Sequence, residues 1–414
     1  MDFFSRMFGQ KRRVYLDYAA ATPVRREVLL AMKPFEDRQY GNASAVHAEG
    51  QAAREALRAS RATVAKILRI KKDEVIFVSG GTEANNLALF GVCEALFHAG
   101  RAPEECEIIT TALEHPSING VLARLKERGV VVHVVPVDSE GLIDQALFES
   151  LLSIRTMLVT FAYANSEIGV VQDVKGMTRA VRKHRTRHAH AFPYVHLDAS
   201  QAPLYLPCAF DSLGVDLMTL DSGKFYGPKG VGVLAKKHHV PLRSMFSGGG
   251  QEEGMRPGTE NIPGIVGFAE ALRYAEKDRS ARVQKITDLR EYAFQSLLAS
   301  LSGSRANGSR ESRIANNINI SIPGIDGEYA TVVLDAKGIA ISTKSACSGA
   351  SGSGSSVIYA LGGDDARALS TLRVTLGEET TKRNIDSLVR ILQEHVEKTR
   401  TILHKFTHIW HSSV

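Results

Sequence analysis

The chain has 414 residues, of which 44% are hydrophobic, 7% aromatic and 23% charged. This composition argues against an intrinsically disordered or membrane-embedded chain, and the length predicts two lobes with a sizeable buried core. The net charge is only +6, with basic residues scattered along the chain, which favours anionic small molecules or acidic partners over nucleic acid.

The N-terminal segment, residues 1–20, begins with bulky apolar and basic side chains. It lacks the long apolar stretch and the small-residue cleavage site of a secretory signal, and no run of about 18 apolar residues occurs anywhere in the chain. We expect this segment to pack with the smaller lobe rather than on a membrane.

From residue 75 onward, short β-branched runs alternate with longer helical stretches, which is typical of a parallel sheet wrapped by crossover helices. The predicted strands cover residues 75–78, 107–111, 131–135, 157–163, 194–198 and 216–220. A helix is predicted to start at Thr82, directly after the Gly80-Gly81 turn. We therefore expect a large α/β domain over residues 21–262, with helices on both faces of a mainly parallel sheet.

A stretch rich in glycine and proline at 248–264 indicates a long functional loop or a crossing between the lobes. Beyond it, helices are predicted over 263–279, 281–301 and 381–405, and a strand over 316–322. These elements predict a smaller α+β domain over 263–414. Within that domain, residues 342–356 are mostly serine and glycine, which predicts a mobile loop.

The four cysteines are Cys93, Cys106, Cys208 and Cys347. They are too few and too widely spread for a disulfide framework in a chain of this length, which favours a reducing, cytoplasmic environment. Only Cys347 has an unusual setting, because it lies in the serine- and glycine-rich loop. The other three are expected to be ordinary core or surface residues.

Three local patterns resemble sites that their context does not support. LDSGKFYG lacks a glycine and a Ser or Thr that a phosphate-binding loop needs, since Met218 and Phe225 stand there. GVGVLA at 230–235 spells a dinucleotide-binding pattern inside a β-type run, so we predict a strand. His184 and His188 share a helix face, as a metal pair would, but no nearby cysteine or carboxylate completes a ligand set, which favours a solvated basic helix end.

The strongest chemical signals lie at the ends of predicted strands. Lys224 is well placed to form a Schiff base, although a surface lysine at a turn explains the local sequence equally well. Asp198 ends another strand, at the edge where open α/β sheets bind ligands, with Gln201 one turn further on. A carboxylate there could keep a pyridine nitrogen protonated, and the helix start at Gly81 and Thr82 suits a phosphate. Together these signals indicate pyridoxal 5'-phosphate (PLP).

Ten motifs stand in an order that is typical of one enzyme family. They are YLDYAAATPV, GNASAVH, SGGTEANN, TALEHPSI, YANSEIGVVQDV, HLDASQAP, KFYGPKGVG, GGGQEEGMRPGTEN, STKSACSGAS and TLRVTLG. In these motifs the sequence resembles the cysteine desulfurases of the iron-sulfur-cluster and nitrogen-fixation type, within the PLP-dependent class V aminotransferase superfamily of fold type I. The resemblance covers about residues 14–400, and ten ordered motifs are far more specific than any one of them.

The resemblance implies a role for each matching residue. Lys224 resembles the lysine that binds PLP covalently, His115 the imidazole stacked on its ring, and Cys347 the nucleophile. The other residues implied in cofactor binding are Gly81, Thr82, Asn165, Asp198, Gln201, Ser222 and, from the second subunit of a homodimer, Thr259. The residues implied in substrate binding are Asn42, Asn165 and Arg373.

The implied reaction removes the sulfur of L-cysteine, giving L-alanine and a persulfide on Cys347. Lys224 would act as the base at the α-carbon, and His115 would donate or accept a proton near the sulfur. The sulfur would pass to an acceptor protein, such as an iron-sulfur scaffold or a tRNA-thiolation enzyme. No metal, no direct contact with nucleic acid and no membrane are implied.

One segment departs from the family pattern. Where the family has a serine, a small residue, a histidine and then the lysine, this chain has Asp221, Ser222, Gly223 and Lys224. A carboxylate beside a phosphate dianion is unfavourable, so we expect Asp221 to point away, with Ser222 or backbone amides holding the phosphate. Weaker retention of the cofactor is a consequence to test.

Three alternatives stay open on sequence alone. A selenocysteine lyase or a cysteine sulfinate desulfinase would use the same lysine chemistry but depend less on Cys347. A true class V aminotransferase would need a keto-acid acceptor. A non-catalytic sulfur-assembly subunit would have kept the fold for binding partners, with the altered segment at Asp221 as the sign of its decay.

Overall fold

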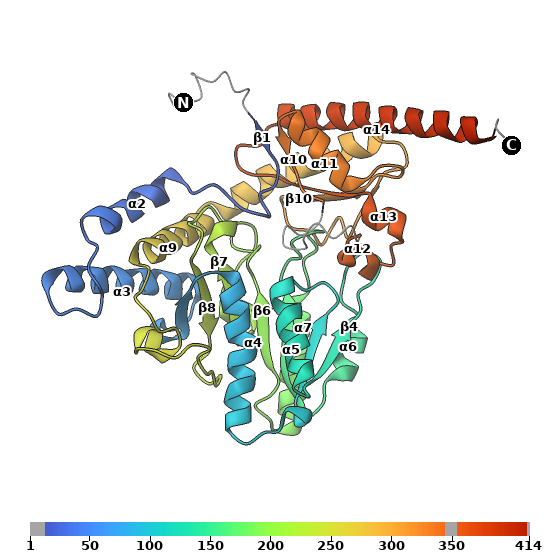
Figure 1. The fold of residues 1–414 in the computed structure, drawn as a ribbon. Coiled ribbons are helices and arrows are strands. Elements are labelled where there is room, and N and C mark those ends of the chain that lie inside the picture. Colours follow the sequence, from blue (N-terminus) through green and yellow to red (C-terminus); the bar gives the residue numbers. More distant parts are fainter. Residues whose placement is uncertain (1–12, 344–353, 412–414) are drawn as a thin grey trace.

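The computed structural model describes residues 13–343 and 354–411. A large lobe is built on one extended sheet, and a smaller lobe lies above the sheet's upper edge in Figure 1. The predicted fold class, a large mainly parallel α/β domain with a smaller α+β domain, is confirmed. No helix in these ranges is long and apolar enough to cross a membrane.

The large sheet has seven strands in the order β2-β8-β7-β6-β5-β3-β4. Their bounds are β2 Val75–Val78, β3 Glu107–Thr111, β4 Val131–Val135, β5 Thr156–Ala162, β6 Tyr194–Asp198, β7 Leu217–Asp221 and β8 Gly232–Lys236. Strand β8 pairs antiparallel with both β2 and β7, and the pairs β3–β4, β3–β5, β5–β6 and β6–β7 are parallel. All six strands predicted in this region are present within one residue of their expected bounds, and GVGVLA contains the start of β8, as expected.

Alternate residues of these strands point into different cores, as the two-residue period of a strand requires. Ile108 packs with helices α4 (Gly81–His98) and α5 (Pro116–Glu127), while the next residue, Ile109, belongs to the core on the opposite face. That second core includes helices α3, α7 and α9. The helices flanking the sheet, besides α4 and α5, are α2 Arg26–Asp37, α3 Ala48–Leu68, α6 Gln145–Leu151, α7 Val174–His188, α8 Phe210–Leu213 and α9 Ile262–Glu276.

The smaller lobe is an antiparallel sheet of order β12-β10-β9 covered by helices. Its strands are β9 Arg305–Ala306, β10 Asn317–Ser321 and β12 Thr371–Thr375, and its helices are α10 Arg279–Ser300, α11 Gly327–Ala336, α12 Ser356–Ala360, α13 Asp365–Leu369 and α14 Lys382–His411. The predicted strand and the helices predicted over 281–301 and 381–405 are confirmed here, with α14 longer than expected, while the helix predicted over 263–279 is α9, which packs on α2 and α3 of the large lobe.

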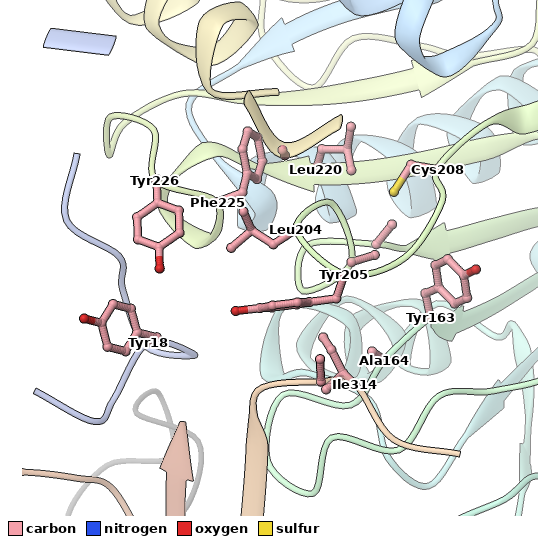
Figure 2. Packing of buried hydrophobic residues seen from close by; sticks show 14 of the residues in the cluster. Tyr18, Tyr163, Ala164, Leu204, Tyr205, Cys208, Leu220, Phe225, Tyr226 and Ile314 are labelled. Carbon is pink, nitrogen blue, oxygen red and sulfur yellow. The ribbon is translucent and has the colours of Figure 1, made fainter. Parts of the chain in front are cut away.

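The N-terminal segment joins the smaller lobe by backbone pairing. Strand β1 (Val14–Tyr15) pairs in parallel with β11 (Ile339–Ala340). One apolar cluster continues from this segment through both lobes, and Figure 2 shows Tyr18, Tyr205 and Ile314 within it. The ring of Tyr18 meets that of Tyr226 edge-on, with centroids 6.2 Å apart. The lobes therefore share a core instead of being separated by a linker.

Candidate active site

A cavity of about 150 Å³ lies where strands β5, β6 and β7 end. The carboxyl ends of parallel strands meet at one edge of a sheet, so residues that end different strands are neighbours there. Eight of the residues expected at the site line this cavity: Gly81, Thr82, His115, Asn165, Asp198, Gln201, Lys224 and Arg373. The first seven belong to the large lobe and Arg373 to the smaller one.

Lys224 follows β7 through the short turn Ser222–Lys224. Its amine donates to the carbonyl oxygens of Ala19 and Ala20, at 3.1 and 2.7 Å. Gln201 donates to the same Ala19 carbonyl at 3.1 Å. The lysine is half-buried and held by neutral acceptors, so its nitrogen faces the cavity without an ion-pair partner among the cavity residues.

Asp198 is fixed by hydrogen bonds to both carboxylate oxygens. Oδ1 accepts from the backbone N–H and the hydroxyl of Ser200, at 3.0 and 2.7 Å. Oδ2 accepts from the amide of Asn85 at 2.8 Å, and Asn85 Nδ2 also lies 2.9 Å from Ser117 Oγ. Asn85 is buried and was not predicted as a site residue. It links the aspartate to the residues that hold His115.

His115 is the N-cap of α5. The backbone N–H of Ser117 donates to its Nδ1 at 3.1 Å, and the Ser117 hydroxyl lies 2.8 Å from the same nitrogen. Because Nδ1 accepts, the proton of the neutral ring is assigned to Nε2. Burial lowers the pKa of His115, against the opposing effect of Asp198, and the Lys224 amine lowers it further. The imidazole is therefore a neutral group that can donate or accept a proton.

Arg373, on β12, enters the cavity from the smaller lobe and is 1% exposed. Its guanidinium donates to Asp17 at 2.8 Å and to the Ser166 carbonyl at 3.1 Å, while Nε is buried with no partner among the described residues. Asn165 holds the adjacent loop: its Oδ1 accepts from two backbone amides at 2.9 Å, and Nδ2 donates to Leu113 at 2.9 Å. Both side chains keep an unused N–H that a substrate carboxylate could accept.

The turn before Lys224 differs from expectation. Asp221 does not point away: it lines the cavity, and its Oδ2 accepts from the backbone N–H of Gly81 at 3.1 Å. The reason is the alternation of β7, where Asp221 lies on the face of Thr219, the register partner of Asp198. The hydroxyl of Ser222 has no hydrogen-bond partner among the residues that the structure describes, and it lies on the other side, where a Cβ at Gly227 would approach it to 2.0 Å.

Besides Ser222, three expected site residues are not among those lining the cavity. Asn42 is exposed, and its Oδ1 accepts from the backbone N–H of Ser44 at 2.9 Å. Thr259 is exposed in the loop before α9, and its role was expected across a dimer. Cys347 lies outside the described residues. The roles of these three stay predictions.

The histidines near α7 do not form a ligand cluster. His184 and His188 have ring centroids 4.6 Å apart, while His196 is buried on β6 between Thr160 and Thr219, at 2.9 and 3.0 Å. No group of three or more metal-ligating side chains occurs among the residues that the structure describes.

The donors and acceptors around the cavity fit PLP at its ring end. Asp198 suits a pyridinium nitrogen, Gln201 a ring hydroxyl, His115 the ring face and Lys224 the aldehyde carbon. At the other end, Gly81 and Thr82 open α4, whose N-terminal amides suit a phosphate. That end also holds the Asp221 carboxylate, which accepts from the Gly81 amide.

Comparison with known proteins assigns the chain to a family. The class-V aminotransferase model matches residues 14–388. The cysteine desulfurase IscS of Dictyoglomus turgidum is 38% identical, covering 95% of this chain and 96% of its own length, and IscS of Histophilus somni is 37% identical, covering 95% of each.

Solved structures agree. A NifS-like protein is 33% identical, covers 93% of this chain and 99% of its own, and has a TM-score of 0.85. A structure described as SspA in complex with cysteine is 29% identical, covers 88% and 98%, and has a TM-score of 0.75. With the motifs, the fold and the cavity in agreement, this chain belongs to the class-V aminotransferase family and, within it, to the PLP-dependent cysteine desulfurases.

Proposed function

We propose that this protein takes the sulfur of L-cysteine onto Cys347, releases L-alanine and passes the sulfur to an acceptor protein such as an iron-sulfur scaffold. One observation carries the proposal. The Lys224 amine, the Asp198 carboxylate and the Arg373 guanidinium face a single cavity in a chain with full-length cysteine desulfurase relatives.

The cofactor-binding roles follow from the groups that face the cavity. Lys224 would bind PLP covalently, Asp198 and Gln201 would hold its ring, and Gly81 and Thr82 its phosphate. Bound in this way, PLP supplies an electron sink for the α-carbon of an amino acid. The Lys224 amine would act as the base that takes the α-proton, and the neutral His115 ring would donate or accept a proton near the substrate sulfur.

The substrate would be held by its carboxylate. Arg373 has a buried Nε without a partner in the described chain, and Asn165 has one spare N–H next to it in the cavity wall. An arginine fork matches a carboxylate in geometry as well as charge. Asn42 is proposed to contact the substrate from the segment before α3.

Sulfur transfer requires a cysteine thiol that can ionise to the nucleophilic thiolate. Burial raises the pKa of Cys93 and of Cys106, and it raises that of Cys208 to about 12, so these three thiols stay protonated at neutral pH. Cys347 is the remaining cysteine. Its sulfur attacks the substrate sulfur, the C–S bond of cysteine breaks, and the β-carbon takes a proton, so that cysteine and a thiol become alanine and a persulfide.

Assembly and location extend the proposal. We infer a homodimer in which Thr259 reaches the phosphate of the partner's cofactor, and a cytoplasmic setting in which reduced thiols persist. The proposed layout is an N-terminal segment over 1–20, a large PLP-binding domain over 21–262 and a smaller domain over 263–414, with the cysteine loop at 342–356.

The test is the stoichiometric release of alanine and sulfide from L-cysteine in the presence of a reducing thiol. Cys347→Ser should abolish sulfide release and persulfide labelling, while Ser345→Ala, a matched change in the same loop, should keep both. Sulfide release by Cys347→Ser equal to that of the wild type would overturn the proposed nucleophile. Stimulation by added 2-oxo acids would instead indicate an aminotransferase.

A further inference from the structure

The phosphate end of the cavity contains a negatively charged side chain. Asp221 Oδ2 accepts from the backbone N–H of Gly81, the first residue of α4, at 3.1 Å. Its Oδ1 accepts from the backbone N–H of Gly223 at 2.9 Å. Both carboxylate oxygens are thus held by amides in the wall that also carries Lys224.

This position is favourable for one anion. The N-cap of α4 is Gly80, which has no side chain to cap the helix, so the first amides of an 18-residue helix are open to an acceptor. Those amides and the helix dipole favour a negative charge at this end. Asp221 provides it from the end of the neighbouring strand β7.

The residues around the carboxylate leave little room for anything larger. A Cβ added at Gly81 would lie 3.2 Å from Asp221 Oδ2, and one added at Gly223 would lie 3.3 Å from Oδ1. Both distances are shorter than ordinary van der Waals contacts. A side chain at position 223, where the family has a histidine, would crowd the Asp221 carboxylate. Glycine at 223 therefore makes room for the aspartate at 221.

Two anions cannot share this end without a cost. A phosphate on the α4 amides would lie in contact with Asp221, and like charges at such distances repel strongly at a partly buried site. Among the described residues that line the cavity, the basic side chains besides His115 are Lys224 and Arg373. Arg373 is paired with Asp17, and Lys224 is needed for the cofactor's aldehyde.

We propose that Asp221 competes internally for the site of the cofactor's phosphate and so reduces the preference of this chain for PLP over unphosphorylated pyridoxal. The inference rests on the proposed orientation of PLP, with its phosphate at α4. Asp221 is then a specificity-determining residue. It leaves the ring-binding groups intact and acts only on the phosphate.

The experiment measures binding instead of turnover. Apoprotein is titrated with PLP and, separately, with pyridoxal, and each dissociation constant is obtained from the change in absorbance and protein fluorescence. The variants are the wild type, Asp221→Asn, which removes the charge in the same shape, and Glu83→Gln. Glu83 lies in the first turn of the same helix, but its carboxylate accepts from Ser79 N–H and pairs with Arg256.

The expected result is specific to one residue and one ligand. Asp221→Asn should tighten PLP at least about tenfold and leave pyridoxal no tighter, because only the phosphate meets the carboxylate. Glu83→Gln should change the ratio of the two constants less than about twofold, since its charge is not on the Gly81 amide. Because the dissociation constant of each aldehyde is compared between variants, differences in the solution chemistry of PLP and pyridoxal do not affect the result.

Two outcomes separate this inference from the proposed function. An unchanged ratio of dissociation constants in Asp221→Asn, with both aldehydes still bound, would overturn the inference alone. If neither aldehyde binds in any variant, the proposed function itself fails. Should Asp221→Asn not fold, Asp221→Ser, which restores the residue usual in the family, gives the same test, and a melting curve of each apoprotein establishes which variants are folded.

Discussion

The two ends of the cavity differ in which groups satisfy their hydrogen bonds. At the ring end, Asp198 accepts from Asn85, and Ser117 links Asn85 to His115, so these side chains form one hydrogen-bonded network within the protein. At the phosphate end, the amides of Gly81 and Gly223 are satisfied by Asp221, a group that a phosphate has to replace. One site can therefore be preorganised for the ring of its cofactor while a side chain of the protein competes with the cofactor's phosphate.

Loss of the lysine should have the largest effect on the ring end. Lys224→Ala should lower desulfurase activity at least about 10³-fold, because it removes both the covalent partner and the base. Mass spectrometry after borohydride reduction should show no cofactor on the variant chain. Lys229→Ala is the matched control, since that amine also donates to a carbonyl of the N-terminal segment, that of Thr22, at 2.5 Å. Equal activity of the two variants would contradict the proposed role.

Neutralising the ring-end acid should come next. Asp198→Asn keeps the shape but removes the charge, and we expect kcat to fall about 10²-fold. The absorbance maximum of bound cofactor should shift as well, which a purely structural role would not produce. A variant with normal kcat and an unshifted spectrum would show that the ring end does not depend on this charge.

The arginine of the smaller lobe should affect binding more than turnover. Arg373→Lys keeps a positive charge but loses the planar fork, so KM for L-cysteine should rise about 30-fold with a smaller change in kcat. Arg390→Lys, at an exposed position of α14, is the control. A fall in kcat alone would place Arg373 outside substrate binding.

A smaller effect is expected for the residue that links the ring-end groups. Asn85→Ala removes the donor to Asp198 and the contact with Ser117, so kcat/KM should fall about tenfold. Combined with Ser117→Ala, the loss should be less than the sum of the two single effects, because both act through one network. Strict additivity would mean that the two side chains work independently.

A buried histidine beside the ring end should make the stability of the fold depend on pH. His196, two residues before Asp198, is fully buried, and burial lowers its pKa to about 4. Since the pKa is lower in the folded chain, its contribution to stability is present above about pH 6.5 and is lost as the pH falls toward 4. Relative to His196→Gln, the free energy of unfolding of the wild type should fall by about 3 kcal/mol across that window. Parallel pH profiles of the two proteins would refute this.

The sequence predicted the parallel sheet well because its strands are short β-branched runs buried on both faces, such as Thr156–Ala162. It also placed Asp198 and Lys224 at strand ends. The prediction that Asp221 points away, which rested on charge repulsion, was wrong, although the two-residue alternation of β7 puts Asp221 on the Thr219 face.

Other features required the folded chain. Asn85 lies three residues after Thr82, one helical turn along α4, so its position near the site was predictable from this spacing. The pairing of Asp17 with Arg373 was not, because 356 residues separate them. Helices α2 and α3, which precede residue 75, were not predicted.

The N-terminal segment has a consequence for how this enzyme can be handled. Within nine residues it pairs with β11, holds Arg373 through Asp17, meets the Lys224 amine through Ala19 and Ala20, and bonds to Gly223 through Thr22. Residues 14–22 thus form hydrogen bonds to a proposed substrate-binding group of the smaller lobe and to a proposed cofactor-binding group of the large lobe. A purification tag or deletion that pulls on residues 14–22 therefore disturbs both groups at once, whereas changes made near the far end of α14 leave them untouched.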